Sequence, residues 1–258
     1  MSAEKTKPDS PPSGCKIVVI IPVLNEEQSI GKVIEALPPG WYHSVIAVDN
    51  GSSDATAHVA SRAGADVISE PRRGYGWACL AGMARAAELD PDIIVFLDGD
   101  YSDYPDDLPD LVQPILEQGA EFVVGSRVRG ERGKGALLPQ ARFGNWLATR
   151  LIRLFWGYRF TDLGPFRAIR WQALQQMRMQ DKTYGWTVEM QIKALRMGLR
   201  VAEVPVRYRK RIGTSKVTGT FSGTIKAGYK ILWTIFRYGL ADRAPGPAPL
   251  VRDEVLTR

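Results

Sequence analysis

The chain has 258 residues, of which 45% are hydrophobic and 24% are charged, and its formal net charge is +6. The composition is that of a globular protein and excludes a disordered chain and a disulfide-rich scaffold, and the length allows one large α/β domain or one domain with a substantial appendage. The positive charge favours an anionic partner, which leaves nucleic acid, a phosphorylated ligand and an anionic membrane as candidates.

The first half of the chain alternates short apolar runs with helical patterns. Residues 1–14 are polar and proline-rich, and we expect them to be a disordered tail. We then predict strands at 17–22, 44–49, 65–68, 93–97 and 121–127, separated by helices at 24–37, 54–63, 77–89 and up to about 117. This alternation predicts a doubly wound, mostly parallel α/β sheet with right-handed crossovers.

Several predicted strands end in polar or charged residues. Asp98-Gly99-Asp100 closes the strand at 93–97, and Glu26, Asp49 and Arg127 follow three others. Because ligands bind at the carboxyl edge of such sheets, these side chains predict a ligand cleft. Two carboxylates there suit Mg²⁺ or Mn²⁺ carrying a diphosphate, although Asp and Gly are also ordinary turn residues.

The second half carries two basic aromatic helical patterns, at 143–159 and 221–240. Each combines an apolar face with arginine or lysine, so each can lie in a membrane interface. For the first pattern, packing on the core with arginines reaching to solvent is an equal alternative. A late strand is predicted at 201–206, and a strongly basic segment follows it.

Four motifs, at 20–26, 48–56, Asp98-Gly99-Asp100 and Gly125-Ser126-Arg127, together resemble those of the family-2 glycosyltransferases. Within this family the chain is most similar to dolichol-phosphate mannose synthases and their bacterial relatives. The resemblance implies the GT-A fold, a Rossmann-like mostly parallel sheet flanked by helices, with amphipathic helices near the C-terminus. It divides the chain into a donor-binding half at 15–130, an acceptor half at 131–240 and a mobile tail at 241–258.

The resemblance also implies an activity. This is the inverting, metal-dependent transfer of mannose or glucose from a nucleoside-diphosphate sugar, of the GDP-mannose or UDP-glucose type, to a polyprenyl phosphate. Contacts to the donor then fall on Pro22, Leu24, Glu26, Ala47, Asp49, Asp98, Gly99, Asp100 and Arg127.

Metal and diphosphate ligands follow from the same resemblance. Asp100 would bind Mg²⁺ or Mn²⁺, with Asp98 and Ser102 as further metal ligands. Lys216 would clamp the diphosphate together with either Lys210 or Arg211. A nucleic-acid patch would explain these basic residues but not the carboxylates, so nucleic acid is not an expected partner.

The candidate catalytic residues are Asp100, Asp162 and Glu189. Asp162 belongs to a segment that resembles one lying near the reacting sugar in relatives. Glu189 would act as general base for a soluble hydroxyl acceptor, whereas a phosphate acceptor needs no base. Its structural alternative is an ion pair within the basic half. A non-catalytic nucleotide-sugar binding protein is the hypothesis from another class.

The expected location is the cytoplasm, at the inner face of the membrane as a peripheral protein. Cys15 and Cys79 have no metal-ligand spacing, and with no signal-like N-terminus we expect free thiols in a reducing compartment. No apolar run is long enough to predict a spanning helix.

Overall fold

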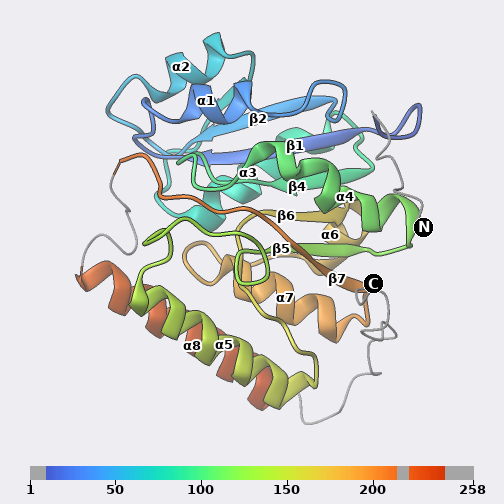
Figure 1. Ribbon diagram of the computed structural model, residues 1–258, viewed down its shortest axis with the longest axis vertical. Coiled ribbons are helices and arrows are strands. Elements are labelled where there is room, and N and C mark those ends of the chain that lie inside the picture. Colours follow the sequence, from blue (N-terminus) through green and yellow to red (C-terminus); the bar gives the residue numbers. More distant parts are fainter. Residues whose placement is uncertain (1–9, 214–220, 242–258) are drawn as a thin grey trace.

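The computed structural model describes residues 10–213 and 221–241. Within these residues, seven strands form one sheet in the order β3-β2-β1-β4-β6-β5-β7, with helices on both faces (Figure 1). The predicted mostly parallel α/β sheet is therefore confirmed. Most of the two predicted tails, and Lys216, lie outside the described residues.

The strands are short, and most are buried apolar runs. All neighbouring strands pair in parallel except β6, which runs antiparallel between β4 and β5. Continuous apolar runs suit strands that are covered on both faces. The strands are β1 (Ile17–Val23), β2 (Ser44–Asp49), β3 (Asp66–Ser69), β4 (Ile93–Phe96), β5 (Phe122–Ser126), β6 (Arg167–Arg170) and β7 (Val201–Pro205).

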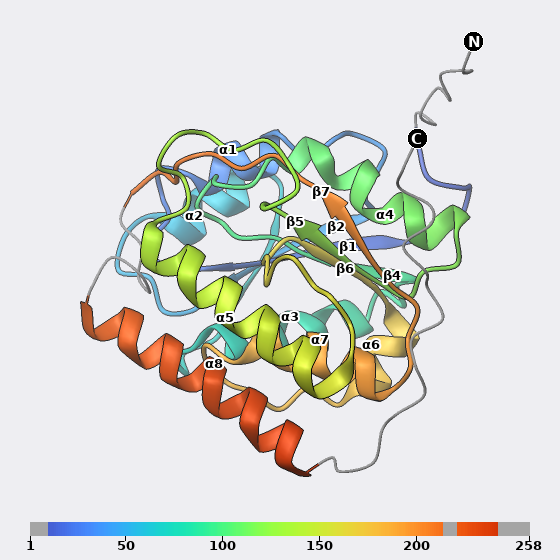
Figure 2. The same ribbon diagram turned by 60° about the horizontal axis from the view of Figure 1, so that its bottom comes forward.

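Helices cover the sheet in layers (Figure 2). One face carries α1 (Ile30–Glu35), α2 (Thr56–Arg62) and α4 (Leu108–Glu117), which follows a short 3₁₀ turn at Pro105–Asp107. The other face carries α3 (Tyr75–Ala87), α6 (Trp171–Met177) and α7 (Trp186–Arg196). Each face has its own cluster of buried side chains, so alternate residues of each central strand enter different cores.

The first helix begins later than the sequence pattern predicts. A helix was expected from residue 24, but α1 begins at Ile30. The preceding residues instead bind the turn after β2: the Asn25 N–H donates to Ser52 Oγ (2.9 Å) and the Glu26 N–H to Thr56 Oγ1 (2.7 Å). Asn25 also has a φ of 53°, outside the helical region. Glu26 is thereby held at the edge of the sheet, and its carbonyl accepts a hydrogen bond from the Ile30 N–H (2.9 Å) where α1 begins.

The two basic aromatic helices, α5 (Pro139–Trp156) and α8 (Phe221–Ala241), lie side by side outside α7 (Figures 1 and 2). Ala148, Ile152 and Ile235 face the core, and the rings of Phe155 and Phe236 meet edge to face at 5.8 Å. Large apolar side chains on the outer side remain exposed: Phe143, Trp146, Leu154, Ile225, Tyr229, Trp233, Phe236 and Leu240. Within the described residues, none of the helices is both long and apolar enough to cross a membrane.

Candidate functional site

A cavity of about 300 Å³ opens at the carboxyl edge of β1 and β4. It brings together seven residues that the sequence predicts to bind the donor: Pro22, Leu24, Glu26, Asp98, Gly99, Asp100 and Arg211. The remainder of the lining includes Asn50, Arg73, Gly74, Tyr75, Thr183 and Tyr184. Parallel strands end at one edge of the sheet, which is why residues so far apart in sequence meet here.

Asp98 and Tyr75 form one wall of this cavity. The Tyr75 hydroxyl donates a hydrogen bond to Asp98 Oδ1 at 3.1 Å. Burial raises the pKa of Asp98, against the positive charge of Arg211 and the Tyr75 hydrogen bond, which lower it. Burial likewise raises the pKa of Tyr75 well above its usual value, so this hydroxyl stays protonated and fixes the orientation of the carboxylate.

Asp100 is buried, and its two oxygens have different partners. Oδ1 accepts hydrogen bonds from the Ser102 N–H (2.9 Å) and the Ser102 hydroxyl (2.5 Å). Oδ2 accepts no hydrogen bond from the described residues but forms an ion pair with the Arg211 guanidinium. The Ile212 N–H donates to the Asp100 carbonyl at 3.0 Å, so the basic segment after β7 lies directly on this acidic turn.

Asp103 adds a third carboxylate to this region and was not predicted to belong to the site. Both of its oxygens are buried and accept no hydrogen bond from the described residues. Burial raises the pKa of Asp103 to about 8, and the charge of Asp98 adds to this rise. Carboxylate oxygens that accept no hydrogen bond keep lone pairs for a hard cation, so Asp100 Oδ2 and the two Asp103 oxygens fit a divalent cation.

The described residues supply few side-chain ligands for such a cation. Among the described residues, no three His, Cys, Asp or Glu side chains are arranged to hold a metal ion. A cation bound by Asp100 would therefore take most of its ligands from diphosphate and water, as Mg²⁺ commonly does. Ser102 orients Asp100 through two hydrogen bonds, and its role as a direct metal ligand stays a prediction.

Arg127 and Asp162 form a hydrogen-bonded ion pair at the same edge of the sheet. Arg127 donates from its backbone N–H, Nε and Nη2 to the two Asp162 oxygens, each at 2.8 Å. Burial would lower the pKa of Arg127, but Asp162 raises it above its usual value, so the guanidinium stays charged. Asp162 is fully buried, and this geometry makes it the residue that positions Arg127.

Besides Arg127, four predicted donor contacts lie away from the cavity lining or outside the described residues. Ala47 is fully buried in the core beneath α1, and Asp49 accepts a hydrogen bond from the Ser52 N–H at 3.0 Å. Lys210 is exposed and does not line the cavity, so Arg211 is the better placed of the two alternatives. The fourth, Lys216, is not described.

Glu189 lies beneath α8 with both carboxylate oxygens engaged. It accepts hydrogen bonds from the backbone N–H of Gln180 (3.1 Å) and Asp181 (2.7 Å) and from the Tyr238 hydroxyl (3.0 Å). Lys193 Nζ lies 2.8 Å from Oε1. These contacts leave no oxygen directed at a substrate hydroxyl, so the geometry favours the structural alternative over the general base.

Asn50 is a supporting residue whose role the sequence did not reveal. Its Nδ2 donates to the carbonyls of Glu70 (2.9 Å) and Arg72 (2.8 Å), and its Oδ1 accepts from the Gly74 N–H (2.8 Å). Gly74 has a φ of 145°, and a Cβ there would meet the Lys182 carbonyl at 2.3 Å. The only sequence signal was the glycines at 74 and 76, which indicate a turn as readily as a binding loop.

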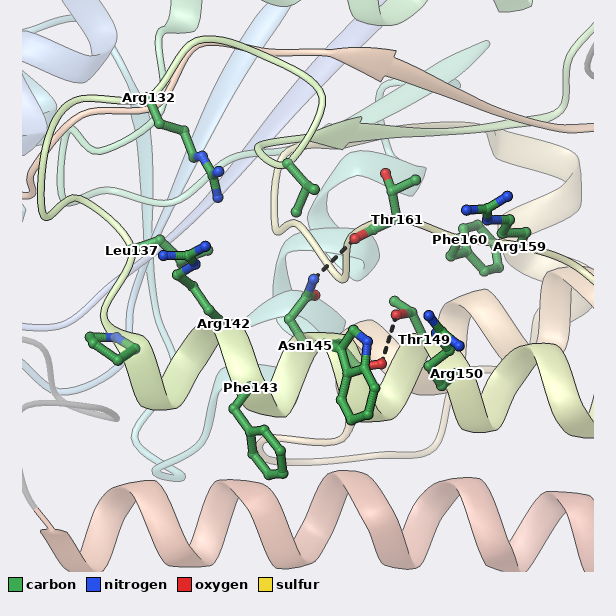
Figure 3. Close-up of a pocket in the computed structure, with 13 residues that line it drawn as sticks. Arg132, Leu137, Arg142, Phe143, Asn145, Thr149, Arg150, Arg159, Phe160 and Thr161 are labelled. Carbon is green, nitrogen blue, oxygen red and sulfur yellow. Dashed lines mark hydrogen bonds between the residues drawn. The ribbon is translucent and has the colours of Figure 1, made fainter.

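A second cavity, of about 580 Å³, lies beside the Arg127–Asp162 pair and is shown in Figure 3. Arg132 and Arg142 lie toward one end, Arg150 and Arg159 toward the other, and Asn145 lies between them. Apolar and aromatic side chains complete the wall: Val128, Leu137, Pro139, Phe143, Trp146 and Phe160. We refer to it as the arginine cavity. None of the residues that line this cavity was singled out as a site residue from the sequence.

Comparison with known proteins gives consistent matches. The model of the family described as glycosyl transferase family 2 matches residues 18–202. An uncharacterised glycosyltransferase of Mycobacterium tuberculosis (strain H37Rv) is 37% identical over 217 residues, covering 83% of this chain and 95% of that protein. Undecaprenyl-phosphate mannosyltransferase of Micrococcus luteus is 30% identical over 247 residues, covering 90% of this chain and 97% of that protein.

A solved structure has a similar fold. The crystal structure of glucosyl-3-phosphoglycerate synthase from Mycobacterium tuberculosis, in complex with Mg²⁺ and uridine diphosphate, superposes with a TM-score of 0.69 at 25% identity. The superposition covers 87% of this chain and 79% of the synthase chain.

Proposed function

This chain belongs to glycosyl transferase family 2, and we propose that it transfers a hexose, with inversion, from a nucleoside-diphosphate sugar to a polyprenyl phosphate, assisted by Mg²⁺ or Mn²⁺. Family membership and the structural match confirm the predicted GT-A fold class. They also confirm the prediction of a glycosyltransferase rather than a non-catalytic binding protein.

The cavity at Asp98 and Asp100 supports the donor half of this proposal. Asp98 is oriented by Tyr75 and Asp100 by Ser102, so both carboxylates are fixed before a ligand binds. Arg211 supplies positive charge at the same place, as a diphosphate requires. A divalent cation at Asp100 would neutralise the charge that develops on the departing nucleoside diphosphate.

The arginine cavity is the single observation that carries the choice of acceptor. No carboxylate among the described residues forms an ion pair with Arg132, Arg142 or Arg159, although all three guanidinium groups line one cavity. Guanidinium groups bind phosphate through paired N–H donors, and aromatic walls suit an isoprenoid chain. Thr161 lines this cavity next to Asp162, the partner of Arg127, so a phosphate bound in the cavity would lie near Arg127.

A phosphate acceptor also fits the contacts of Glu189. An ionised phosphate oxygen attacks without losing a proton, so the reaction needs no general base. The hydroxyl acceptor considered from the sequence would need one, and both Glu189 oxygens already accept hydrogen bonds.

The outer face of α5 and α8 supports attachment to a membrane. The exposed side chains of these two helices include aromatic residues such as Phe143 and Tyr229 and the basic residues Arg153, Lys226 and Arg237. Such helices bind an anionic lipid surface through apolar burial and charge together. The arginine cavity borders the same helix α5, so a lipid acceptor would approach from this side.

The test is a transfer assay with the purified full chain and Mn²⁺. GDP-mannose, UDP-glucose and UDP-N-acetylglucosamine are each offered with undecaprenyl phosphate in anionic vesicles, and separately with phosphoglyceric acid as a soluble acceptor. We expect sugar to appear on the lipid with one of these donors. Transfer only to the soluble acceptor, or to neither, would reject the lipid proposal.

A matched pair of variants links this activity to the arginine cavity. Arg142→Gln removes one cavity guanidinium and should raise the acceptor KM about tenfold, because a charged hydrogen bond is lost. Arg62→Gln makes the same change on the exposed surface of α2 and should leave the acceptor KM unchanged. Equal acceptor KM values for the two variants would place the acceptor elsewhere.

A further inference from the structure

Glu203, on β7, is a buried carboxylate that the donor and acceptor features do not explain. It is 6% exposed. Its oxygens accept hydrogen bonds from the Thr161 N–H (2.9 and 3.0 Å), the Thr161 hydroxyl (3.1 Å) and the Asp162 N–H (3.2 Å). Among the described residues, no cation forms an ion pair with this carboxylate. Burial raises its pKa to about 7.

The two residues that Glu203 holds belong to different parts of the site. Thr161 lines the arginine cavity, and its carbonyl accepts a hydrogen bond from Asn145 Nδ2 of α5 at 3.0 Å. Asp162 binds the guanidinium of Arg127. The Glu203 carboxylate therefore contacts both Thr161, in the wall of the arginine cavity, and Asp162, which binds Arg127.

The backbone of Glu203 is fixed independently of its side chain. It lies opposite Val124 in the parallel pairing of β5 with β7, and its carbonyl accepts a hydrogen bond from Arg129 Nη1 at 3.1 Å. A buried carboxylate is costly, and an apolar residue would satisfy the sheet equally well. The carboxylate is best explained by the three donors that converge on it.

We propose that Glu203 is a positioning residue. Its carboxylate fixes the backbone of Thr161 and Asp162, and thereby fixes the position of the arginine cavity wall relative to Arg127. The inference rests on the proposed function because it takes the arginine cavity as the acceptor site. Glu203 touches neither substrate in this arrangement, so its replacement should affect acceptor binding while donor binding is retained.

The experiment compares three substitutions in the full chain. Glu203→Leu removes the acceptor of all three donors at similar volume, Glu203→Asp withdraws the carboxylate by one methylene, and Glu203→Gln keeps an oxygen where the donors converge. The exposed Glu117→Gln on α4 is the control for the same amide substitution. Farnesyl phosphate is the acceptor probe and UDP with Mn²⁺ the donor probe, each measured by calorimetry. The acceptor and donor KM values are measured in parallel.

Glu203→Leu should weaken farnesyl phosphate binding and raise the acceptor KM about tenfold, with donor values within about twofold of wild type. Glu203→Gln should restore acceptor binding to within about threefold of wild type, because its amide oxygen still accepts the donors. Should Glu203→Leu fail to fold, Glu203→Asp decides: a selective loss of acceptor binding supports the inference.

Two results would overturn it. One is a Glu203→Asp variant with wild-type affinity for farnesyl phosphate, and the other is an equal loss of donor and acceptor binding. A wild-type chain that does not bind farnesyl phosphate would also overturn it. A wild-type chain that binds the probe but transfers no sugar would instead reject the proposed reaction and leave the positioning role supported by the binding data.

Discussion

Arg127 and Asp162 are joined by three contacts of equal length: the backbone N–H, Nε and Nη2 of Arg127 each lie 2.8 Å from an Asp162 oxygen. Their sequence neighbours Val128 and Thr161 line the arginine cavity, and the pKa of Asp98, which burial raises, is lowered by the charge of Arg127. The Arg127 guanidinium also lies over the Tyr208 ring, 5.1 Å from the centroid. Because a planar fork is held on two sides, its direction is fixed before either substrate binds.

Arg127→Lys should therefore lower kcat/KM by about ten- to a hundredfold, because lysine keeps the charge but cannot form the fork. The free energy of unfolding should fall by about 1–3 kcal/mol, since one Asp162 oxygen loses its donor. Arg200→Lys, at an exposed pair with Glu121, is the control and should change neither quantity. Wild-type kcat/KM in Arg127→Lys would show that the fork has no role in the reaction.

Removal of the metal should be reversible and should depend on Asp100. We expect UDP with Mn²⁺ to raise the unfolding temperature of the wild-type protein, and a chelator to abolish that rise until Mn²⁺ is restored. Asp100→Asn should lose the Mn²⁺-dependent part of the rise, because the amide is a weaker ligand for a hard cation. Asp106→Asn, at an exposed position on the following 3₁₀ turn, should retain it. An intact Mn²⁺ response in Asp100→Asn would exclude Asp100 as the ligand.

Stability should decrease as the pH rises through neutrality, in part because of Glu203. Burial raises the pKa of this carboxyl from 4.5 to about 7, so the folded state binds its proton more tightly than the unfolded state does. The resulting stabilisation is complete below pH 4.5 and is lost as the pH rises through 7. At most about 3 kcal/mol is involved.

Urea unfolding at pH 5 and pH 8 measures this effect. Glu203→Gln should lose less stability than wild type between the two values, because its side chain does not ionise. The pKa of Asp103 is also raised, so Asp103 also lowers the free energy of unfolding as the pH rises. This contribution is the same in wild type and variant and cancels from their difference. Identical losses in wild type and variant would show that Glu203 titrates near its ordinary value.

The outer face of α5 and α8 should bind anionic vesicles. Replacing both Phe143 and Tyr229 by Ser removes side chains that are 63% and 69% exposed, so the fold should be unaffected. Vesicle binding should fall by about tenfold or more, because apolar area no longer enters the lipid. Met197→Ser, which removes an exposed apolar side chain just beyond α7, is the control. Cosedimentation is the measurement, and equal binding of both variants would exclude this face.

Much of the fold could be predicted because buried parallel strands are continuous apolar runs, and β2 was predicted with its observed bounds. The strand β6 could not be predicted. Its sequence, Arg-Ala-Ile-Arg, has no apolar run, and its extended form comes from pairing with β4 and β5 on both sides. The start of α1 was misplaced for a similar reason, since contacts with residues 52–56 override the local helical preference.

The site divides in the same way. Asp98, Gly99 and Asp100 follow an apolar run directly, so their place at the sheet edge follows from local pattern. Asp103 and Glu203 carry no such signal, because an acid in a turn or in a short strand is ordinarily solvated. Only their burial distinguishes them, and burial depends on the whole fold. Glu189 is the converse case. Its position in the sequence suggested a general base, but its carboxylate already accepts hydrogen bonds within the fold.

The antiparallel direction of β6 has a further consequence. The chain leaves the sheet after Ser126 and re-enters it at Arg167, at the same edge. The two ends are joined by a hydrogen bond from the Gly125 N–H to the Phe166 carbonyl (2.8 Å) and by the Ser126 and Thr161 hydroxyls (2.7 Å). Every residue that lines the arginine cavity falls within 128–161, inside this closed excursion. If the arginine cavity binds the acceptor as proposed, substitutions within this segment would change acceptor choice without altering β4, whose end carries Asp98 and Asp100.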